Sequence, residues 1–292
     1  MPIFSRSANR KRRPRAKIIF LCLICCAAFP ALWAFVIEPN RLVLRETQIT
    51  LPAWPASFKG LRIGVISDLH GGAPYITTEK IRQVVEMTNA AQPDLVVMPG
   101  DFVIQNVLGG RFMEPEAIAS ELNGLRARFG AFAALGNHDW WYNGPRVKKA
   151  LENAGIRVLE NDALKIEFNA EAIWLVGIGD MWEGSPNIAS ALAKVPRMVN
   201  GDAPIIAFTH NPDIFPSIPS GVSLTIAGHT HGGQVRLPII GRPIVPSAFG
   251  ERYAAGHIVE GGKNLFVTSG IGTSILPVRF RVPPEISLLT IN

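Results

Sequence analysis

Short apolar runs recur along the chain after residue 60, and most of them end in polar side chains. The first spans residues 61–67 (LRIGVIS), and similar runs lie around 94–98, 130–135, 173–178, 205–209 and 223–227. Continuous apolar runs of this kind, bounded by polar residues, are typical of strands that are buried on both faces. We therefore predict a strand at each position, with polar side chains at its carboxyl end.

Helical spacing fills the intervals between several of these runs. In residues 78–91, Ile81, Val84, Val85 and Thr88 recur at the spacing of one helix face. The other predicted helices span 116–129, 144–153 and 186–199, and the last predicted strands span 257–260, 265–268 and 286–291. Alternating strands and helices with a strand-rich end predict an α/β fold, in which two packed sheets are covered by helices.

The segment before these runs is apolar over a much longer stretch. A helix needs about 20 apolar residues to cross roughly 30 Å of hydrocarbon, and the uncharged stretch 18–37 has this length. We predict a transmembrane helix or signal anchor here. The alternatives are a cleaved signal peptide, for which Leu32-Trp33-Ala34 is a poor cleavage match, a twin-arginine signal at Arg12-Arg13, and a buried core helix.

The net charge of +6 is located almost entirely in residues 1–17, which hold seven basic residues and no acid. The remainder is nearly neutral, which argues against a nucleic-acid polymer as partner, because such binding needs clustered Lys and Arg. The positive-inside rule places residues 1–17 in the cytoplasm and everything after Glu38 on the extracytoplasmic side. We therefore expect a single-pass protein of the cell membrane.

These features divide the chain into four parts. We expect a basic cytoplasmic tail at 1–17, the span at 18–37, a connector or edge strand at 38–60, and one catalytic domain, acting as a monomer, at 61–292. The three cysteines, Cys22, Cys25 and Cys26, all lie in the apolar segment. No cysteine is therefore available to form a disulfide in the exported domain.

The polar residues that follow the predicted strands are of the types that bind metals. Five segments carry them: Asp68-Leu69-His70, Gly100-Asp101, Gly136-Asn137-His138-Asp139, His210, and Gly228-His229-Thr230-His231. Five of the six histidines lie in these segments, and only His257 lies outside. A single histidine after a strand is usually structural, but random placement would not gather five of them at strand ends.

The spacing and chemistry of these side chains favour a site for two metal ions. Asp68 and His70 are two residues apart, so on extended backbone they point to one side, and His229 and His231 have the same spacing. Imidazole with carboxylate suits Mn, Fe or Zn better than Ca or Mg. Asp101 has two carboxylate oxygens and could bridge two ions about 3.5–4 Å apart, as in two-metal phosphatases.

Taken in order, the motifs D-x-H, G-D, G-N-H-D, H and G-H-T-H resemble those of the calcineurin-like metallophosphoesterase family across residues 61–292. The resemblance implies a four-layer α-β-β-α sandwich of two facing mixed β-sheets flanked by helices. It also implies that one metal ion is bound by Asp68, His70, Asp101 and His231, and the other by Asp101, Asn137, His210 and His229. His138 corresponds to the family's catalytic histidine, and Asp139 is either its partner or a helix cap.

The two divalent ions would clamp phosphate oxygens while a water between them loses a proton and attacks phosphorus in line. The stretches 209–213 and 228–235 resemble a branch of membrane-attached or exported bacterial phosphodiesterases, some of which act on lipid-linked substrates such as UDP-diacylglucosamine. We therefore expect a membrane-anchored phosphodiesterase for a phospholipid or nucleotide-lipid. The alternatives are a tethered phosphatase or phosphodiesterase for a soluble nucleotide-type substrate, and a metal-binding scaffold.

Two further groups of residues have open roles. The aromatic stretches 140–142 and 181–182 lie close to the metal motifs, where they could hold a lipid chain or a base, or pack in the core. Arg279 and Arg281 could bind phosphate, although solvated surface charge is the favoured interpretation.

Overall fold

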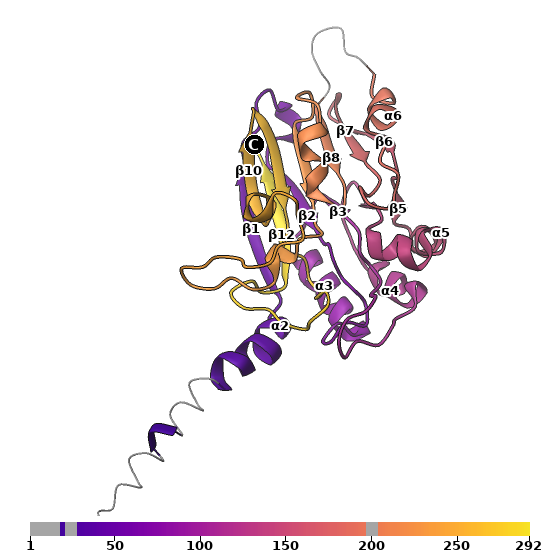
Figure 1. Ribbon diagram of the computed structural model, residues 1–292. Coiled ribbons are helices and arrows are strands. Elements are labelled where there is room, and N and C mark those ends of the chain that lie inside the picture. Colours follow the sequence, from indigo (N-terminus) through magenta and orange to yellow (C-terminus); the bar gives the residue numbers. More distant parts are fainter. Residues whose placement is uncertain (1–17, 21–27, 197–203) are drawn as a thin grey trace, which may run out of the picture.

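The computed structural model describes residues 18–20, 28–196 and 204–292, and two facing six-stranded sheets form its centre (Figure 1). The first sheet has the order β1(Val43–Ile49), β12(Glu285–Ile291), β2(Leu61–Val65), β3(Leu95–Met98), β4(Ala131–Ala133), β5(Arg157–Val158). The second has the order β10(Gly256–Glu260), β11(Lys263–Val267), β9(Leu224–Ala227), β8(Ile205–Phe208), β7(Glu171–Gly177), β6(Asp162–Phe168). Both sheets are mixed: β2 to β5 run parallel and β12 antiparallel to β2, whereas β7, β8, β9 and β11 run parallel between antiparallel edges.

The space between the sheets is an apolar core to which both contribute. Alternate residues of a strand point to opposite faces, so Ile63 and Val65 of β2 face inward, where they join Ile206 and Phe208 of β8. The opposite face of β3, including Val96, packs on helices instead. Because both faces are covered, the strands are continuous apolar runs, which is why the sequence pattern located them.

Helices cover the outer face of each sheet, so the predicted order of layers is confirmed. The first sheet is covered by α3(Thr78–Ala90), α4(Pro115–Leu122) and α5(Asn137–Asn153). The second is covered by α6(Ile188–Ala193) and the 3-10 helix η3(Pro212–Ser217). The remaining short helices are η2(Ala56–Phe58), η4(His231–Gly233) and η5(Gly250–Tyr253).

Several element boundaries differ from the predicted ones. The helix α4 ends at Leu122, before Asn123-Gly124, rather than at residue 129. The helix α5 begins at Asn137 and not after Gly144, because a kink at Asn143 allows a first turn directly after β4. Strand β6 was not predicted, since it is an edge strand with polar, partly exposed residues. The predicted helix at 186–199 is present only as α6, and residues 197–203 lie outside the described residues.

The expected connector at 38–60 contains a strand of the sheet. Strand β1 pairs in parallel with β12 over its full length and forms one edge of the first sheet. The edge-strand interpretation is therefore confirmed, and the first sheet begins before residue 61.

The N-terminal region is helical where it is described. Residues 18–20 and 28–32 are helical, followed by the π-helix η1(Trp33–Ile37) and by α2(Glu38–Asn40). Within the described ranges, none of the helices combines the length and apolar character that crossing a bilayer requires. The predicted span at 18–37 includes residues 21–27, which lie outside the described residues, as does the basic tail 1–17.

Candidate metal centre

The five polar segments predicted as metal-binding meet where strands of the two sheets end. Those of the first sheet follow β2, β3 and β4, and those of the second follow β8 and β9. Parallel neighbours end at the same edge of a sheet, so their following residues are brought together. All eight predicted site residues are buried, the most exposed being His138 at 8%.

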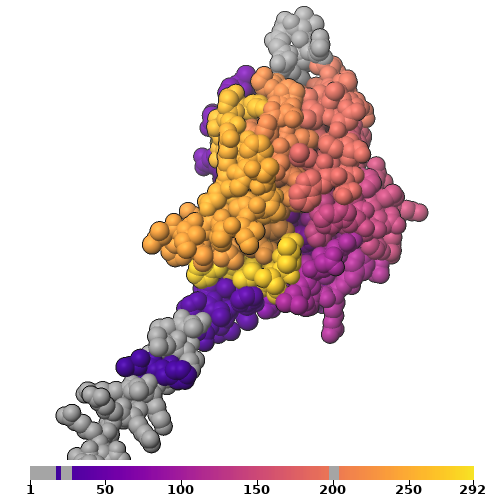
Figure 2. Space-filling view, in the orientation of Figure 1, coloured from indigo at the N-terminus to yellow at the C-terminus, as the bar shows by residue number. Residues whose placement is uncertain are grey.

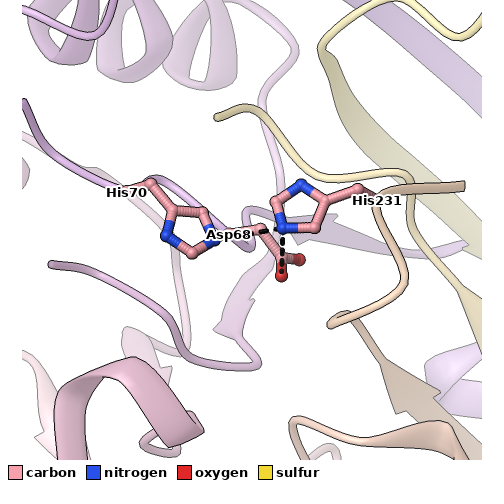
Figure 3. Close-up of side chains that lie close together, drawn as sticks. All are labelled: Asp68, His70 and His231. Carbon is pink, nitrogen blue, oxygen red and sulfur yellow. Dashed lines mark hydrogen bonds and ion pairs between the residues drawn. The ribbon is translucent and has the colours of Figure 1, made fainter. Parts of the chain in front are cut away.

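One cluster consists of Asp68, His70 and His231 (Figure 3). The Nε2 atom of His231 lies 3.6 Å from Oδ1 of Asp68 and 3.1 Å from Nε2 of His70. The two histidines come from different sheets, and their rings stack with centroids 4.9 Å apart. Three ligand atoms that converge in this way could hold one metal ion.

A second cluster consists of Asp101, His210 and His229. The Nε2 atom of His210 lies 3.2 Å from Oδ2 of Asp101 and 3.1 Å from Nδ1 of His229. The same Asp101 oxygen is 3.5 Å from Nε2 of His70. Asp101 therefore connects the two clusters, as its predicted bridging position requires.

The pKa values of the histidine rings differ across the site. Nδ1 of His210 lies 2.8 Å from the carbonyl oxygen of Pro99, to which it can donate, leaving Nε2 free to act as a ligand. Burial lowers the pKa of His70 and of His229 to about 3, so both rings are neutral at pH 7. Burial also lowers the pKa of His210, but the Asp101 carboxylate outweighs it and raises this pKa to about 10. A cation bound to Asp101 would compete with that proton.

An unpaired polar atom also fits a cation. Oδ1 of Asn137 is buried and has no hydrogen-bond partner among the described residues. Buried polar atoms are normally paired, so each such exception needs a partner that the chain does not supply. Asn137 lines the same pocket as Asp101, His229 and His231, so it lies beside both clusters.

The backbone at these residues is strained. Five non-glycine residues of the clusters have positive φ: 53° at Asp68, 46° at His70, 58° at Asp101, 69° at His229 and 50° at His231. Such a conformation costs of order 1–3 kcal/mol per residue and persists mainly at functional sites. At this site the positive φ turns the backbone sharply after each strand and directs the side chains of the clusters toward each other.

A family model described as calcineurin-like phosphoesterase matches residues 61–233. The chain belongs to the calcineurin-like phosphoesterase family. The match spans strands of both sheets and every residue of the two clusters. The protein is therefore a metallophosphoesterase, an enzyme that hydrolyses phosphoric esters.

Relatives of this metallophosphoesterase match most of its length. An uncharacterized metallophosphoesterase of Bacillus subtilis, YkuE, is 31% identical over 89% of this chain and 89% of its own length. The phosphodiesterase YaeI of Escherichia coli is 30% identical over 78% of this chain and 81% of its own. The UDP-2,3-diacylglucosamine pyrophosphatase LpxG of Chlamydia trachomatis is 26% identical over 88% of this chain and 91% of its own length.

Asp139 acts as a helix cap and a backbone anchor in the metallophosphoesterase. Its carboxylate accepts hydrogen bonds from the backbone N–H groups of Asp101 and Phe102, each at 2.9 Å, of Val103 at 3.2 Å, and of Gly136 at 2.9 Å. Of the two roles considered from the sequence, the cap is the one observed. Asp139 thereby fixes the turn after β3 against the start of α5.

His138 and two tryptophans line a pocket of about 310 Å³ above the clusters. The ring centroid of Trp141 lies 4.9 Å from that of His138, and that of Trp182 lies 4.5 Å from that of His229. Nε1 of Trp141 donates to Glu183 at 2.9 Å, which joins the two aromatic segments beside the pocket. Trp140 and Tyr142, by contrast, pack against the helical core.

The two arginines near the C-terminus have different environments, and Arg279 has neither of the two roles that were considered for it from the sequence. Arg279 is fully buried and donates to the carbonyl oxygens of Ser269 at 3.0 Å, Gly270 at 3.2 Å, Gly272 at 2.5 Å and Val282 at 3.1 Å. It is neither a phosphate ligand nor a surface charge. Both arginines alternate with apolar residues, so no local pattern distinguishes Arg279 from the exposed Arg281.

The loop that Arg279 holds supports Asp68. The N–H of Gly272 donates to the carbonyl oxygen of Asp68 at 2.6 Å. A Cβ atom on Gly270 would lie 2.6 Å from Cβ of Asp68, so the loop packs directly behind this residue. Arg279 is thus a positioning residue for the first cluster that the sequence did not indicate.

Replacing Arg279 with methionine should lower the free energy of unfolding by about 3 kcal/mol or more, because four buried carbonyl groups lose their donor. Urea denaturation of the two proteins measures the difference. Arg281→Met, two residues away and exposed, is the matched control and should change the value by less than about 0.5 kcal/mol. Equal effects of both substitutions would contradict the role given to Arg279.

Proposed function

We propose that this metallophosphoesterase is a dinuclear phosphodiesterase that holds two divalent ions, Mn, Fe or Zn. The proposed ligands of one ion are Asp68, His70, Asp101 and His231, and those of the other are Asp101, Asn137, His210 and His229. The observation that carries this proposal is the position of Oδ2 of Asp101, 3.5 Å from Nε2 of His70 and 3.2 Å from Nε2 of His210. One carboxylate oxygen thus faces both clusters, as a bridging ligand must.

His138 is the proposed catalytic residue. When bound, a pair of such ions polarises phosphoryl oxygens and lowers the pKa of water toward neutrality. The backbone N–H of His138 donates to Oδ1 of Asp101 at 2.9 Å, which fixes the ring beside the bridging carboxylate. Burial lowers the pKa of His138, so the neutral ring can donate a hydrogen bond from its N–H to a phosphate oxygen or to the leaving oxygen and stabilise the charge there.

Hydrolysis of bis(p-nitrophenyl) phosphate by the full chain in detergent tests both assignments. Activity should be lost on chelation and restored by Mn²⁺ or Zn²⁺. Asp101→Ala and His138→Ala should each lower the rate roughly 10²–10⁴-fold. Only Asp101→Ala should also lower the amount of bound metal, because His138 is not a proposed ligand.

The control for this experiment is His257→Ala. His257 lies outside the site, on β10, where it pairs with Asn264 at 3.1 Å, so its loss should leave the rate within roughly twofold. A wild-type chain that is inactive with every metal would reject the phosphodiesterase. Full activity of Asp101→Ala would reject the bridging role.

We further propose a substrate with a lipid part, such as a phospholipid or a nucleotide-lipid resembling UDP-diacylglucosamine. The pocket is lined by Trp141, Trp182 and Ile275, which are 46%, 51% and 72% exposed. Exposed apolar side chains beside a polar centre suit a ligand whose phosphate is attached to an acyl chain. The similarity to LpxG, which is named for a lipid-linked substrate, supports the same class.

A comparison of substrates separates this proposal from hydrolysis of a soluble nucleotide-type ester. The value of kcat/KM for a UDP-diacylglucosamine in mixed micelles should exceed that for a UDP-sugar without acyl chains by roughly tenfold or more. Trp182→Ala should reduce the preference. Equal values for the two substrates would favour the soluble alternative.

The proposed location is the cell membrane, with the N-terminus in the cytoplasm, the catalytic domain on the other side, and the chain acting as a monomer. Ile18, Ile19, Phe20, Phe29 and Leu32 are 52–66% exposed, which in water would be unfavourable for so many apolar side chains. Both clusters are formed by a single chain.

Alkaline phosphatase, a reporter that is active only outside the cytoplasm, should be active when fused after Asn292. A cytoplasmic reporter such as green fluorescent protein at the same position serves as the reciprocal control. Fluorescence of that fusion together with an inactive phosphatase fusion would show the opposite topology.

A further inference from the structure

The loop of residues 235–245, which we call the tip loop, projects from the body of the domain (Figures 1 and 2). It begins shortly after His231 and ends before Pro246, and both of these residues line the pocket above the clusters. A bridge from Val235 to Phe280 attaches the base of the loop to the domain, and a bridge between Leu237 and Gly241 closes a tight turn within the loop. The tip loop is therefore anchored at the site and extends away from it.

The end of the tip loop is apolar and exposed. Ile239 is fully exposed, and Ile240 and Ile244 are 69% and 77% exposed. Isolated exposed apolar residues are common on protein surfaces. Three isoleucines on one projecting loop are not, because the exposure of each to water is unfavourable. The arrangement therefore suits a partner that accepts apolar side chains.

Arginines surround the base of the tip loop. Arg236, Arg242, Arg45 and Arg281 line one cavity of about 200 Å³. Arg45 pairs with Glu285 at 2.9 Å and Arg242 with Glu251 at 3.9 Å. Within residues 28–196 and 204–292, Arg236 and Arg281 form no ion pair. The cavity at the base of the tip loop therefore holds more basic than acidic side chains, Glu285 being the acidic one, and suits anionic phosphate groups.

The tip loop lies beside the N-terminal helical segment. The N–H of Arg236 donates to the carbonyl of Phe280 at 2.8 Å, and the N–H of the preceding residue, Arg279, donates to the carbonyl of Ala34 in η1 at 2.9 Å. The loop base and η1 therefore contact consecutive residues of one strand-like segment. In Figure 1 the tip loop extends from the same end of the domain as η1 and α2.

We propose that the tip loop docks on an anionic lipid bilayer. Ile239, Ile240 and Ile244 enter the interface between headgroups and acyl chains, while Arg236 and Arg281 bind lipid phosphates. The proposal rests on the membrane attachment proposed above and adds a second contact at the site itself. Since Pro246 and Ile275 line the pocket, docking places the pocket opening next to the lipid surface.

A fluorescent label on the tip loop tests the proposal. In the full chain, Cys22, Cys25 and Cys26 are replaced by alanine and Ile239→Cys is introduced. The new cysteine is labelled with the environment-sensitive dye NBD. It is reconstituted in vesicles of phosphatidylglycerol with phosphatidylcholine, or of phosphatidylcholine alone. In the anionic vesicles we expect a blue shift, an emission gain of roughly twofold or more, and quenching by spin-labelled lipids. Val259→Cys on β10, 65% exposed, is the matched control and should show none of these changes.

A charge-reversal variant tests the role of the two arginines, and an activity assay tests the catalytic site separately. Arg236→Glu combined with Arg281→Glu should abolish most of the emission gain at position 239. A label at 239 that remains as water-exposed as the label at 259 overturns the proposal, and equal gains in neutral vesicles overturn the role of the arginines. Metal-dependent hydrolysis of the soluble diester by the labelled chain tests the proposed function separately, so failure of docking and failure of catalysis are distinguishable.

Discussion

The carboxylate of Asp101 is the group on which the arrangement of the site depends. One oxygen faces His70 from the first sheet and His210 from the second, and the other accepts the N–H of His138. The backbone N–H of Asp101 in turn donates a hydrogen bond to the carboxylate of Asp139. A carboxylate can serve all these neighbours because its two oxygens carry several lone pairs. Contacts that converge on this one side chain thus connect the carboxyl ends of strands from both sheets.

The strained turns around this carboxylate require support from the surrounding structure. Five residues of the clusters have positive φ, which the chain would avoid without compensating contacts. Asp139 holds the turn after β3 through four backbone N–H groups. Arg279 holds the loop behind Asp68 through four backbone carbonyls. Both are buried, and both act on the backbone, so the side chains of the two clusters remain free to face each other.

One side of the pocket beside the two clusters is lined by apolar side chains. Trp141, Trp182 and Ile275 line the pocket, and so do His231 and Pro246, which flank the tip loop in the sequence. The residues proposed to contact lipid are therefore connected to the pocket through both ends of the tip loop. Such an arrangement would let a phosphoester reach the ions while its acyl chains stay close to the bilayer, without full transfer through water.

The sequence by itself determined most of the strands and the polar side chains that follow them, because these follow from local periodicity and from the chemistry of single residues, and the resemblance of its motifs to a known family implied the order of layers. It located Asp68, Asp101 and His229 at strand ends correctly, but not the true start of α5 or strand β6. The tertiary structure alone decided the role of Asp139, the burial of Arg279 and the projection of the tip loop. The partners of Asp139 include backbone N–H groups 36–38 residues away, and those of Arg279 are carbonyl groups 3–10 residues away in a loop packed behind Asp68. No local pattern records these contacts, because they form only when the loops pack against the strand ends.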